Sequence, residues 1–299
     1  MTSSGELFAS LPSGIDICYE TFGEPGDPPI LLIMGLGGPM NWWSVELCEK
    51  IAGRGFFVIR YDNRDTGRST KLSHHPVSKN VIVKAYVGRH KPPYELDDFA
   101  EDALGLLGHL GLESVHLVGV SMGGMIAQTI AIAHPDRVLS LTSIMSTTGK
   151  RTVGWQHPRV IPALLASAGK TRDSYIERSL RTSKVIGSPA YPGDERLSRA
   201  RAGETYDRGW SASGTVRHML AVLGQRDRTK ELATLDIPVT VIHGLKDPLV
   251  HRSGGKATAA AIPGAEHIEI DGMGHDLPPE LYDTYVDAIE RTTKRAVSR

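Results

Sequence analysis

Short runs of apolar residues recur along the chain, separated by stretches that are rich in glycine, proline and charged residues. Seven of these runs have the length and composition of strands: 15–22, 29–35, 56–62, 114–120, 138–145, 238–244 and 265–272. Several are continuously apolar instead of alternating, which is typical of strands buried on both faces. The pattern therefore predicts a mostly parallel sheet that is covered on both sides.

The stretches between these runs carry the three- and four-residue spacing of helices. Residues 95–110 place five apolar side chains at this spacing: Leu96, Phe99, Ala103, Leu107 and Leu110. Acidic residues crowd the first turn of this segment and a glycine follows it, as helix electrostatics and capping favour. Residues 122–134 and 280–295 also have helical patterns. Strands that alternate with helices predict an α/β fold with helices on both faces of the sheet.

The alternation stops between residues 149 and 231, where the pattern is helical but interrupted by prolines. Residues 150–230 hold 16 Lys and Arg against 7 Asp and Glu, an excess of nine positive charges. We expect residues 149–231 to form a helical cap, or lid, inserted into a core of residues 1–148 and 232–299. The excess charge fits either a solvated, arginine-rich surface or a lid that recruits acidic ligands.

The bulk composition narrows the classes of function. The 299 residues carry no formal net charge, so we expect no strong attraction to nucleic acid or to an anionic membrane. No apolar run reaches the roughly 18 residues of an integral membrane segment, and the start lacks the pattern of a secretion signal. Cys18 and Cys48 have no metal or redox spacing, which favours reduced thiols in a cytoplasmic protein. We find no nucleotide loop or metal-ligand cluster and expect no cofactor; the sequence leaves a homodimer open.

One serine stands where a strand-type run changes into a helix-type run. Residues 119–123 read Gly-Val-Ser-Met-Gly and match the pattern G-x-S-x-G. A serine at a sharp strand-to-helix turn needs strained backbone angles, and glycines two positions away avoid a collision across the turn. The turn would expose the Ser121 hydroxyl as a nucleophile at the start of a helix, with the Met122 N–H free to bind an oxyanion. The alternative is a structural serine in a tight turn.

A serine nucleophile needs a base, and the base needs an orienting carboxylate. Asp247 follows the predicted strand 238–244, and His275 follows the predicted strand 265–272. Because the carboxyl ends of parallel strands share one edge of a sheet, we expect Ser121, Asp247 and His275 to converge there. The other histidines are better explained as structural or surface residues, and only His275 completes the order Ser, Asp, His.

A second oxyanion donor is expected in the glycine-rich stretch 31–38, after the first long buried strand. Leu36 is the preferred backbone donor, with Gly35 or Gly37 as alternatives in register, and a plain glycine turn is the competing interpretation. Four large side chains near these segments are candidates for an apolar substrate pocket: Trp42, Trp43, Met125 and Met145. Residues of this kind are more often part of the core.

Four segments together resemble the α/β-hydrolase superfamily over essentially the whole chain: GVSMGG (119–124), GLKDPLV (244–250), GMGHDLP (272–278) and RYDNRDTGRST (60–70). The chain looks most similar to the aclacinomycin methylesterase-like and lipase/esterase group within the superfamily. Segment 60–70 departs from the superfamily signature D-x-R-G-x-G-x-S, because Asp65, followed by Thr66, stands at the position of the first glycine. Met34 likewise stands where a histidine is common.

The resemblance implies an eight-stranded sheet, a helical cap inserted after the sixth strand, and ester hydrolysis without a cofactor. A serine at position 121 argues against dehalogenase or epoxide hydrolase chemistry, for which the resemblance would demand aspartate. We therefore predict a serine hydrolase of small-molecule carboxylic esters, with small to medium acyl or methyl groups. A thioesterase, lactonase, perhydrolase, acyl transferase or C–C bond hydrolase on the same residues remains an alternative, as does a ligand receptor with little turnover.

Overall fold

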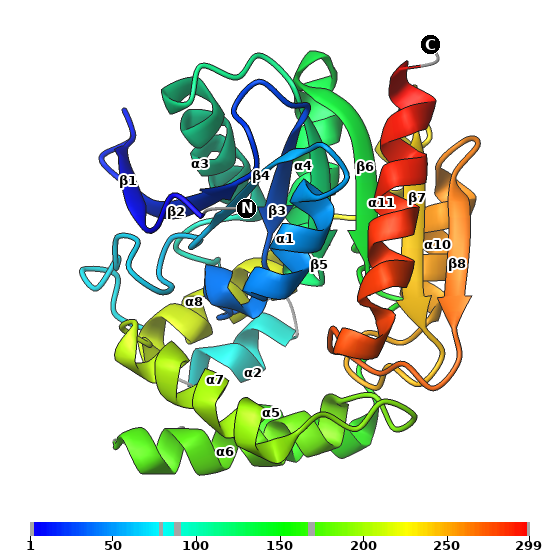
Figure 1. Cartoon of the computed structure of the whole chain (residues 1–299). Helices are drawn as coiled ribbons and strands as arrows, with labels where there is room; N and C mark the ends of the chain where they lie inside the picture. The colour runs from blue at the N-terminus through cyan, green and yellow to red at the C-terminus, as the bar shows by residue number, and fades with distance from the viewer. Residues whose placement is uncertain (1–2, 78–79, 87–90, 167–170, 298–299) are drawn as a thin grey trace.

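An eight-stranded sheet runs through the centre of the protein (Figure 1). The computed structural model describes residues 3–77, 80–86, 91–166 and 171–297. The strands have the order β1-β2-β4-β3-β5-β6-β7-β8. β1 and β2 pair antiparallel, as do β2 and β4, and all pairs from β4–β3 to β7–β8 are parallel. The bounds are β1 Leu7–Ser10, β2 Asp16–Phe22, β3 Pro29–Ile33, β4 Phe57–Tyr61, β5 Val115–Val120, β6 Val138–Ile144, β7 Val239–Gly244 and β8 Glu266–Ile270.

The seven predicted strands are all present, and the mostly parallel α/β architecture is confirmed. The eighth strand, β1, is missing from the sequence prediction because only one of its four residues is buried. Its apolar residues are mostly exposed at the edge of the sheet, and its main-chain pairing with β2 places it there.

Helices cover both faces of the sheet (Figure 1). On one face α3 (Leu96–His109), α4 (Met122–Ala133) and α10 (Ser253–Ala261) pack on strand residues such as Leu31 and Leu117. On the other face α1 (Val45–Ala52) and α11 (Tyr282–Val297) pack on residues such as Ile30 and Val118. Adjacent strand residues thus enter opposite layers, as the two-residue period of a strand requires, and both layers are apolar.

The connection between β6 and β7 is helical and has no strand among its described residues. It contains α5 (Ile161–Leu165), α6 (Arg172–Ile186), α7 (Glu195–Asp207), α8 (Ala212–Gly224) and the short α9 (Thr229–Leu232). The helices α5–α8 lie beyond the carboxyl ends of the strands, at the bottom of Figure 1, where α2 (Asn80–Tyr86) packs against α8. Four 3₁₀ turns complete the described elements: Met40–Trp42, Pro135–Arg137, Pro158–Val160 and Pro279–Leu281. The domain division at residues 149 and 231 stays a prediction.

The basic residues of the 149–231 segment fall into two groups. Several lie on its surface in exposed ion pairs, such as Arg172 with Asp207 and Arg199 with Glu177. Others, including Arg208 and Arg217, are buried against acidic residues of the core. The surface group fits the solvated interpretation of the excess charge, and the buried group holds the segment to the core.

A buried histidine in β5 makes the stability of the fold depend on pH. His116 is 3% exposed, its Nδ1 lies 2.8 Å from the Ser140 hydroxyl, and burial lowers its pKa to about 4. In the unfolded chain a histidine has a pKa of about 6.5, so between these values the unfolded state binds the extra proton. The free energy of unfolding should therefore fall as the pH drops from 6.5 to 4.

We expect His116→Gln to weaken this dependence, because glutamine does not titrate. Between pH 7 and pH 5, the one histidine accounts for a loss of about 2 kcal/mol in the free energy of unfolding. Urea unfolding of both proteins at the two pH values measures it. If the variant and the wild type lose the same amount, the buried neutral state of His116 is contradicted.

Candidate active site

Ser121 sits at a strained turn between β5 and α4. Its backbone has φ 55° and ψ −118°, a left-handed region that residues other than glycine rarely adopt. Steric crowding requires glycine at the two positions that flank the turn. A Cβ on Gly119 would lie 2.3 Å from the Gly123 carbonyl oxygen, and one on Gly123 would lie 2.0 Å from the Ile33 carbonyl oxygen. The tight packing of the turn against β3 leaves the serine side chain at the start of α4.

The structure brings the three predicted side chains together. The His275 Nε2 lies 3.0 Å from the Ser121 Oγ, and the His275 Nδ1 lies 2.7 Å from the Asp247 Oδ2. A carboxylate at Nδ1 favours the tautomer with the proton on that nitrogen, which leaves Nε2 to accept from the serine hydroxyl. The arrangement is therefore suited to take a proton from Ser121 when its oxygen attacks an electrophile.

Asp247 is held as a carboxylate in a buried position. Its Oδ1 accepts the backbone N–H groups of Leu249 and Val250 at 2.8 and 2.9 Å. Burial alone would raise its pKa, but the charge of His275 and hydrogen bonds from His243 and His275 outweigh burial and lower the pKa. His243, with its Nε2 3.5 Å from the Asp247 Oδ2, is a neighbour that the sequence prediction treated as structural only.

Residues at the end of α6 and just after it hold the loop that carries His275. The backbone N–H of His275 donates to the Ile186 carbonyl at 2.7 Å, and the Gly274 N–H donates to the Ser188 Oγ at 2.8 Å. The Ser188 hydroxyl in turn donates to the Asp276 carboxylate. The helical segment thus contacts the loop that carries His275 directly, and no local sequence pattern predicts this contact.

The predicted oxyanion donors lie on two sides of Ser121. Met122 begins α4, and Leu36 lies in the loop after β3, residues 34–40, which we call the glycine loop. A Cβ on Gly35 would lie 3.2 Å from the Ser121 Cβ, so this loop passes directly beside the serine. Among the described residues, the N–H groups of Leu36 and Met122 donate to no other residue, whereas the Gly37 N–H donates to the His218 Nδ1 at 3.2 Å. The geometry therefore favours Leu36 over Gly37 as a donor.

The pocket candidates divide between core and surface. Trp43, Met125 and Met145 are 1%, 3% and 1% exposed and belong to the two apolar clusters that flank the sheet. These three side chains are therefore packed in the core, and a role for them in the substrate pocket stays a prediction. Trp42 is 36% exposed, donates from Nε1 to the Thr205 Oγ1 at 3.0 Å, and so meets α7.

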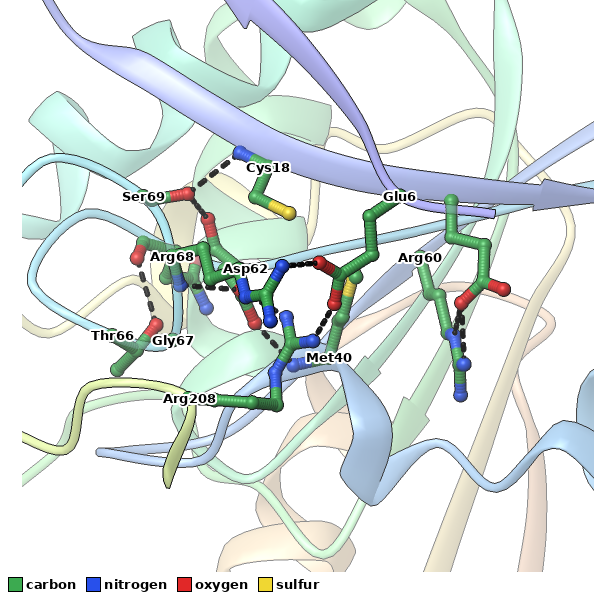
Figure 2. Close-up of polar contacts among 12 residues, drawn as sticks. Glu6, Cys18, Met40, Arg60, Asp62, Thr66, Gly67, Arg68, Ser69 and Arg208 are labelled. Atoms are coloured by element: carbon green, nitrogen blue, oxygen red, sulfur yellow. Dashed lines mark hydrogen bonds and ion pairs between the residues drawn. The ribbon is translucent and has the colours of Figure 1, made fainter. Parts of the chain in front are cut away.

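Segment 60–70 contributes polar side chains that the sequence prediction did not assign a role. The Asp62 Oδ1 accepts the Met40 N–H at 2.7 Å, and the Asn63 Nδ2 donates to the Met34 carbonyl at 3.0 Å. Figure 2 shows Asp62 between Met40 and Arg208. Both ends of the glycine loop are thus tied to this segment. Thr66 suits the turn, because its hydroxyl donates to the Asn63 carbonyl at 2.7 Å.

Two features are absent from the described part of the chain. No group of three or more His, Cys, Asp or Glu side chains in it is placed to hold a metal ion. None of its helices combines the length and the apolar character needed to span a bilayer.

A serine at a strand-to-helix turn, with a histidine and an aspartate at the same sheet edge, defines the site of a serine-type α/β hydrolase. Residues 28–280 match the alpha/beta hydrolase fold family, and the chain belongs to that family. Among its relatives are the rhodomycin D methylesterases of Streptomyces peucetius and Streptomyces sp. strain C5, which are 29% and 30% identical. Each alignment covers 94% of this chain and 96% of the relative.

A solved structure supports the same fold. The enol-lactonase from Burkholderia xenovorans LB400 superimposes with a TM-score of 0.73 at 21% identity, over 96% of this chain and 100% of that one. The predicted superfamily and the methylesterase-like group are thereby confirmed.

We expect Gly123→Ala to destabilise the protein by about 3 kcal/mol or more. The added methyl group would clash with the main chain of β3, which cannot move aside as a flexible side chain could. The matched control is Gly108→Ala in α3, where a Cβ meets no atom within 4 Å. That change should be neutral or stabilise by about 0.5–1 kcal/mol. Urea unfolding of both variants measures the difference, and similar stabilities would argue against the close packing of the turn.

Proposed function

We propose that this protein is a serine hydrolase that cleaves carboxylic esters through an acyl-enzyme intermediate. The observation that carries the proposal is the pair of hydrogen bonds that links Ser121 to His275 and His275 to Asp247. The family and the methylesterase relatives support ester hydrolysis by a serine hydrolase. The roles of the individual residues are our proposal.

In the first half-reaction, the Ser121 oxygen attacks the acyl carbon while His275 Nε2 takes the hydroxyl proton. Asp247 holds the imidazole in the required tautomer and stabilises its charged form. The tetrahedral oxyanion accepts hydrogen bonds from the Leu36 and Met122 N–H groups, each worth about 3–4 kcal/mol of transition-state stabilisation. His275 then gives the proton to the alkoxide leaving group, and the alcohol departs.

In the second half-reaction, a water molecule replaces the alcohol. His275 takes a proton from the water, and the resulting hydroxide attacks the acyl-serine ester. The same two N–H groups bind the second oxyanion. Collapse of this intermediate releases the acid, and the proton on His275 returns to Ser121. The cycle consumes one ester and one water and yields one acid and one alcohol.

Methyl esters are the substrate class that we favour, because the two methylesterase relatives align over nearly the whole chain. The helical segment 149–231 is proposed to act as a cap that sets selectivity, since it lies beyond the carboxyl ends of the strands. Thioesterase, lactonase and C–C bond hydrolase activities use the same residues and remain alternatives for the same site. Trp42 remains a candidate pocket residue, and a cytoplasmic location and a homodimer remain predictions.

Ser121→Ala should lower kcat for a p-nitrophenyl ester by about four to six orders of magnitude, because the covalent route is lost. Steady-state hydrolysis of p-nitrophenyl and methyl esters measures it, together with labelling by a fluorophosphonate probe. The control is Ser10→Ala, whose hydroxyl bonds Asp16 on the exposed edge of the sheet. Near wild-type turnover by Ser121→Ala would refute the nucleophile. Labelling without multiple turnovers in the wild type would favour a ligand receptor.

Asp247→Asn should lower kcat by about four orders of magnitude while the fold persists, because an amide donor at this position stabilises the wrong imidazole tautomer. His275 Nε2 would then carry the proton and could not accept from Ser121. Single-turnover kinetics and urea unfolding of the variant distinguish this loss of kcat from a loss of folded protein. A variant with wild-type kcat would show that Asp247 does not orient the base.

A further inference from the structure

The glycine loop needs external support to hold one conformation. Three of its seven residues are glycines, Gly35, Gly37 and Gly38, and Gly37 has a φ of 67°. Glycine has a wide choice of backbone angles, so a loop of this composition loses much entropy when it is fixed. A displacement of about 1 Å in a catalytic group can lower a rate by about a hundredfold. Contacts that fix this loop therefore bear directly on the oxyanion donors.

The described contacts fix the loop at three points. Asn63 holds the Met34 carbonyl at its start, and Asp62 holds the Met40 N–H at its end. The third contact is at the centre, where the Gly37 N–H donates to the His218 Nδ1. The first two side chains come from segment 60–70, but His218 comes from α8, in the helical segment. The centre of the loop, next to Leu36, is thus the point that depends on the helical segment.

The hydrogen bonds of His218 assign its tautomer. Its Nε2 lies 2.7 Å from the Arg64 carbonyl oxygen, which can only accept, so Nε2 carries the proton. The Nδ1 is then the acceptor for Gly37. His218 is fully buried, and burial lowers its pKa to about 4, so the ring is neutral at neutral pH. An edge contact with the Phe99 ring, at 4.9 Å between centroids, further fixes the plane of the imidazole.

Two buried ion pairs hold the helical segment against segment 60–70. Arg217, the neighbour of His218 in α8, binds both oxygens of Asp65 at 2.7 Å. Arg208, just after α7, binds the Asp62 Oδ2 at 2.6 Å, as Figure 2 shows. The Arg217–Asp65 pair is bidentate, which fixes its geometry as well as its distance. The position of His218 relative to the glycine loop is therefore set by the ion pairs that join the helical segment to segment 60–70.

We propose that His218 is a positioning residue of the oxyanion hole, which holds the Gly37 N–H so that the Leu36 N–H stays available to the developing oxyanion. The proposal rests on the ester hydrolysis proposed above. Without an acceptor at this position, the half-buried Gly37 N–H must bind water or turn the loop to find another partner, and turning the loop displaces Leu36. His218 does not touch the substrate; it acts through the backbone of the loop.

Three variants separate the two hydrogen bonds of His218. In His218→Asn, the side-chain oxygen takes the place of Nδ1 and keeps an acceptor for Gly37. In His218→Gln, the side-chain nitrogen takes the place of Nε2 and keeps the donor to Arg64, but the acceptor at the Nδ1 position is lost. His218→Leu removes both groups. Compared with the wild type, the Asn variant therefore tests the loss of the donor to Arg64, and the Gln variant tests the loss of the acceptor for Gly37 at similar polarity.

We expect kcat for a p-nitrophenyl ester to fall about ten- to a hundredfold in the Gln and Leu variants, with KM changed less than about threefold. The Asn variant should keep kcat within about threefold of the wild type. The inhibition constant of a boronic acid, which forms a tetrahedral adduct with the serine, should rise in parallel with the loss of kcat. A structural role alone would not produce this order of variants or spare KM.

The matched control is His116→Gln. His116 is another buried histidine whose pKa is lowered to about 4, but it lies in β5, away from the glycine loop. Its kcat per folded molecule should equal that of the wild type. Urea unfolding curves give the folded fraction of each protein. An equal loss of kcat in the Asn, Gln and Leu variants, or no loss in any of them, would overturn the proposal.

Deuterium exchange of the glycine loop distinguishes this proposal from the proposed function. Peptides that span residues 34–40 should exchange about tenfold faster or more in the Gln and Leu variants than in the Asn variant, whether or not the protein turns over esters. A wild type that hydrolyses no ester would refute the proposed function and leave this readout intact. Unchanged exchange in all three variants would refute the role of His218 and leave ester hydrolysis standing.

Discussion

A serine hydroxyl is a weak nucleophile unless a neutral base lies within hydrogen-bond distance of it. Here that contact joins Ser121 to His275, which are 154 residues apart in the chain. No local preference can bring them together, so the parallel sheet must do so by placing the ends of β5 and β8 at one edge. The strained angles of Ser121 and the two glycines beside it follow from the same need, because the turn must present the hydroxyl without side chains in the way.

The sequence predicts those parts of the molecule that local rules control. Short runs of apolar residues, several of them continuous, predict β2 to β8, and the G-x-S-x-G pattern predicts the turn at Ser121. The order of strands in the chain then predicts where Asp247 and His275 lie, because each follows a strand of the same sheet. β1 could not be predicted in this way, since its place depends on pairing with β2 rather than on an apolar pattern.

The contacts that hold the loops of the site in place are harder to predict, because they are polar and join residues far apart in the chain. Asp62 and Asn63 belong to a segment with a recognisable pattern, yet only the folded structure reveals that they bind the main chain of the glycine loop. His218 and Ser188 lie in the helical segment and have no motif around them. Their roles arise from contacts with residues 181 and 86 positions away, which no periodicity or spacing encodes.

The electrostatics of the helical segment explain why these contacts can be specific. Residues 150–230 have an excess of nine positive charges while the whole chain is neutral, so the remainder carries the opposite excess. Some of these opposite charges meet in buried ion pairs, Arg208 with Asp62 and Arg217 with Asp65. Buried ion pairs add little net stability relative to apolar packing, but breaking one is costly. The pairs therefore favour one docked arrangement over shifted ones, and that arrangement is the one that places His218 at the glycine loop and Ser188 at the loop of His275.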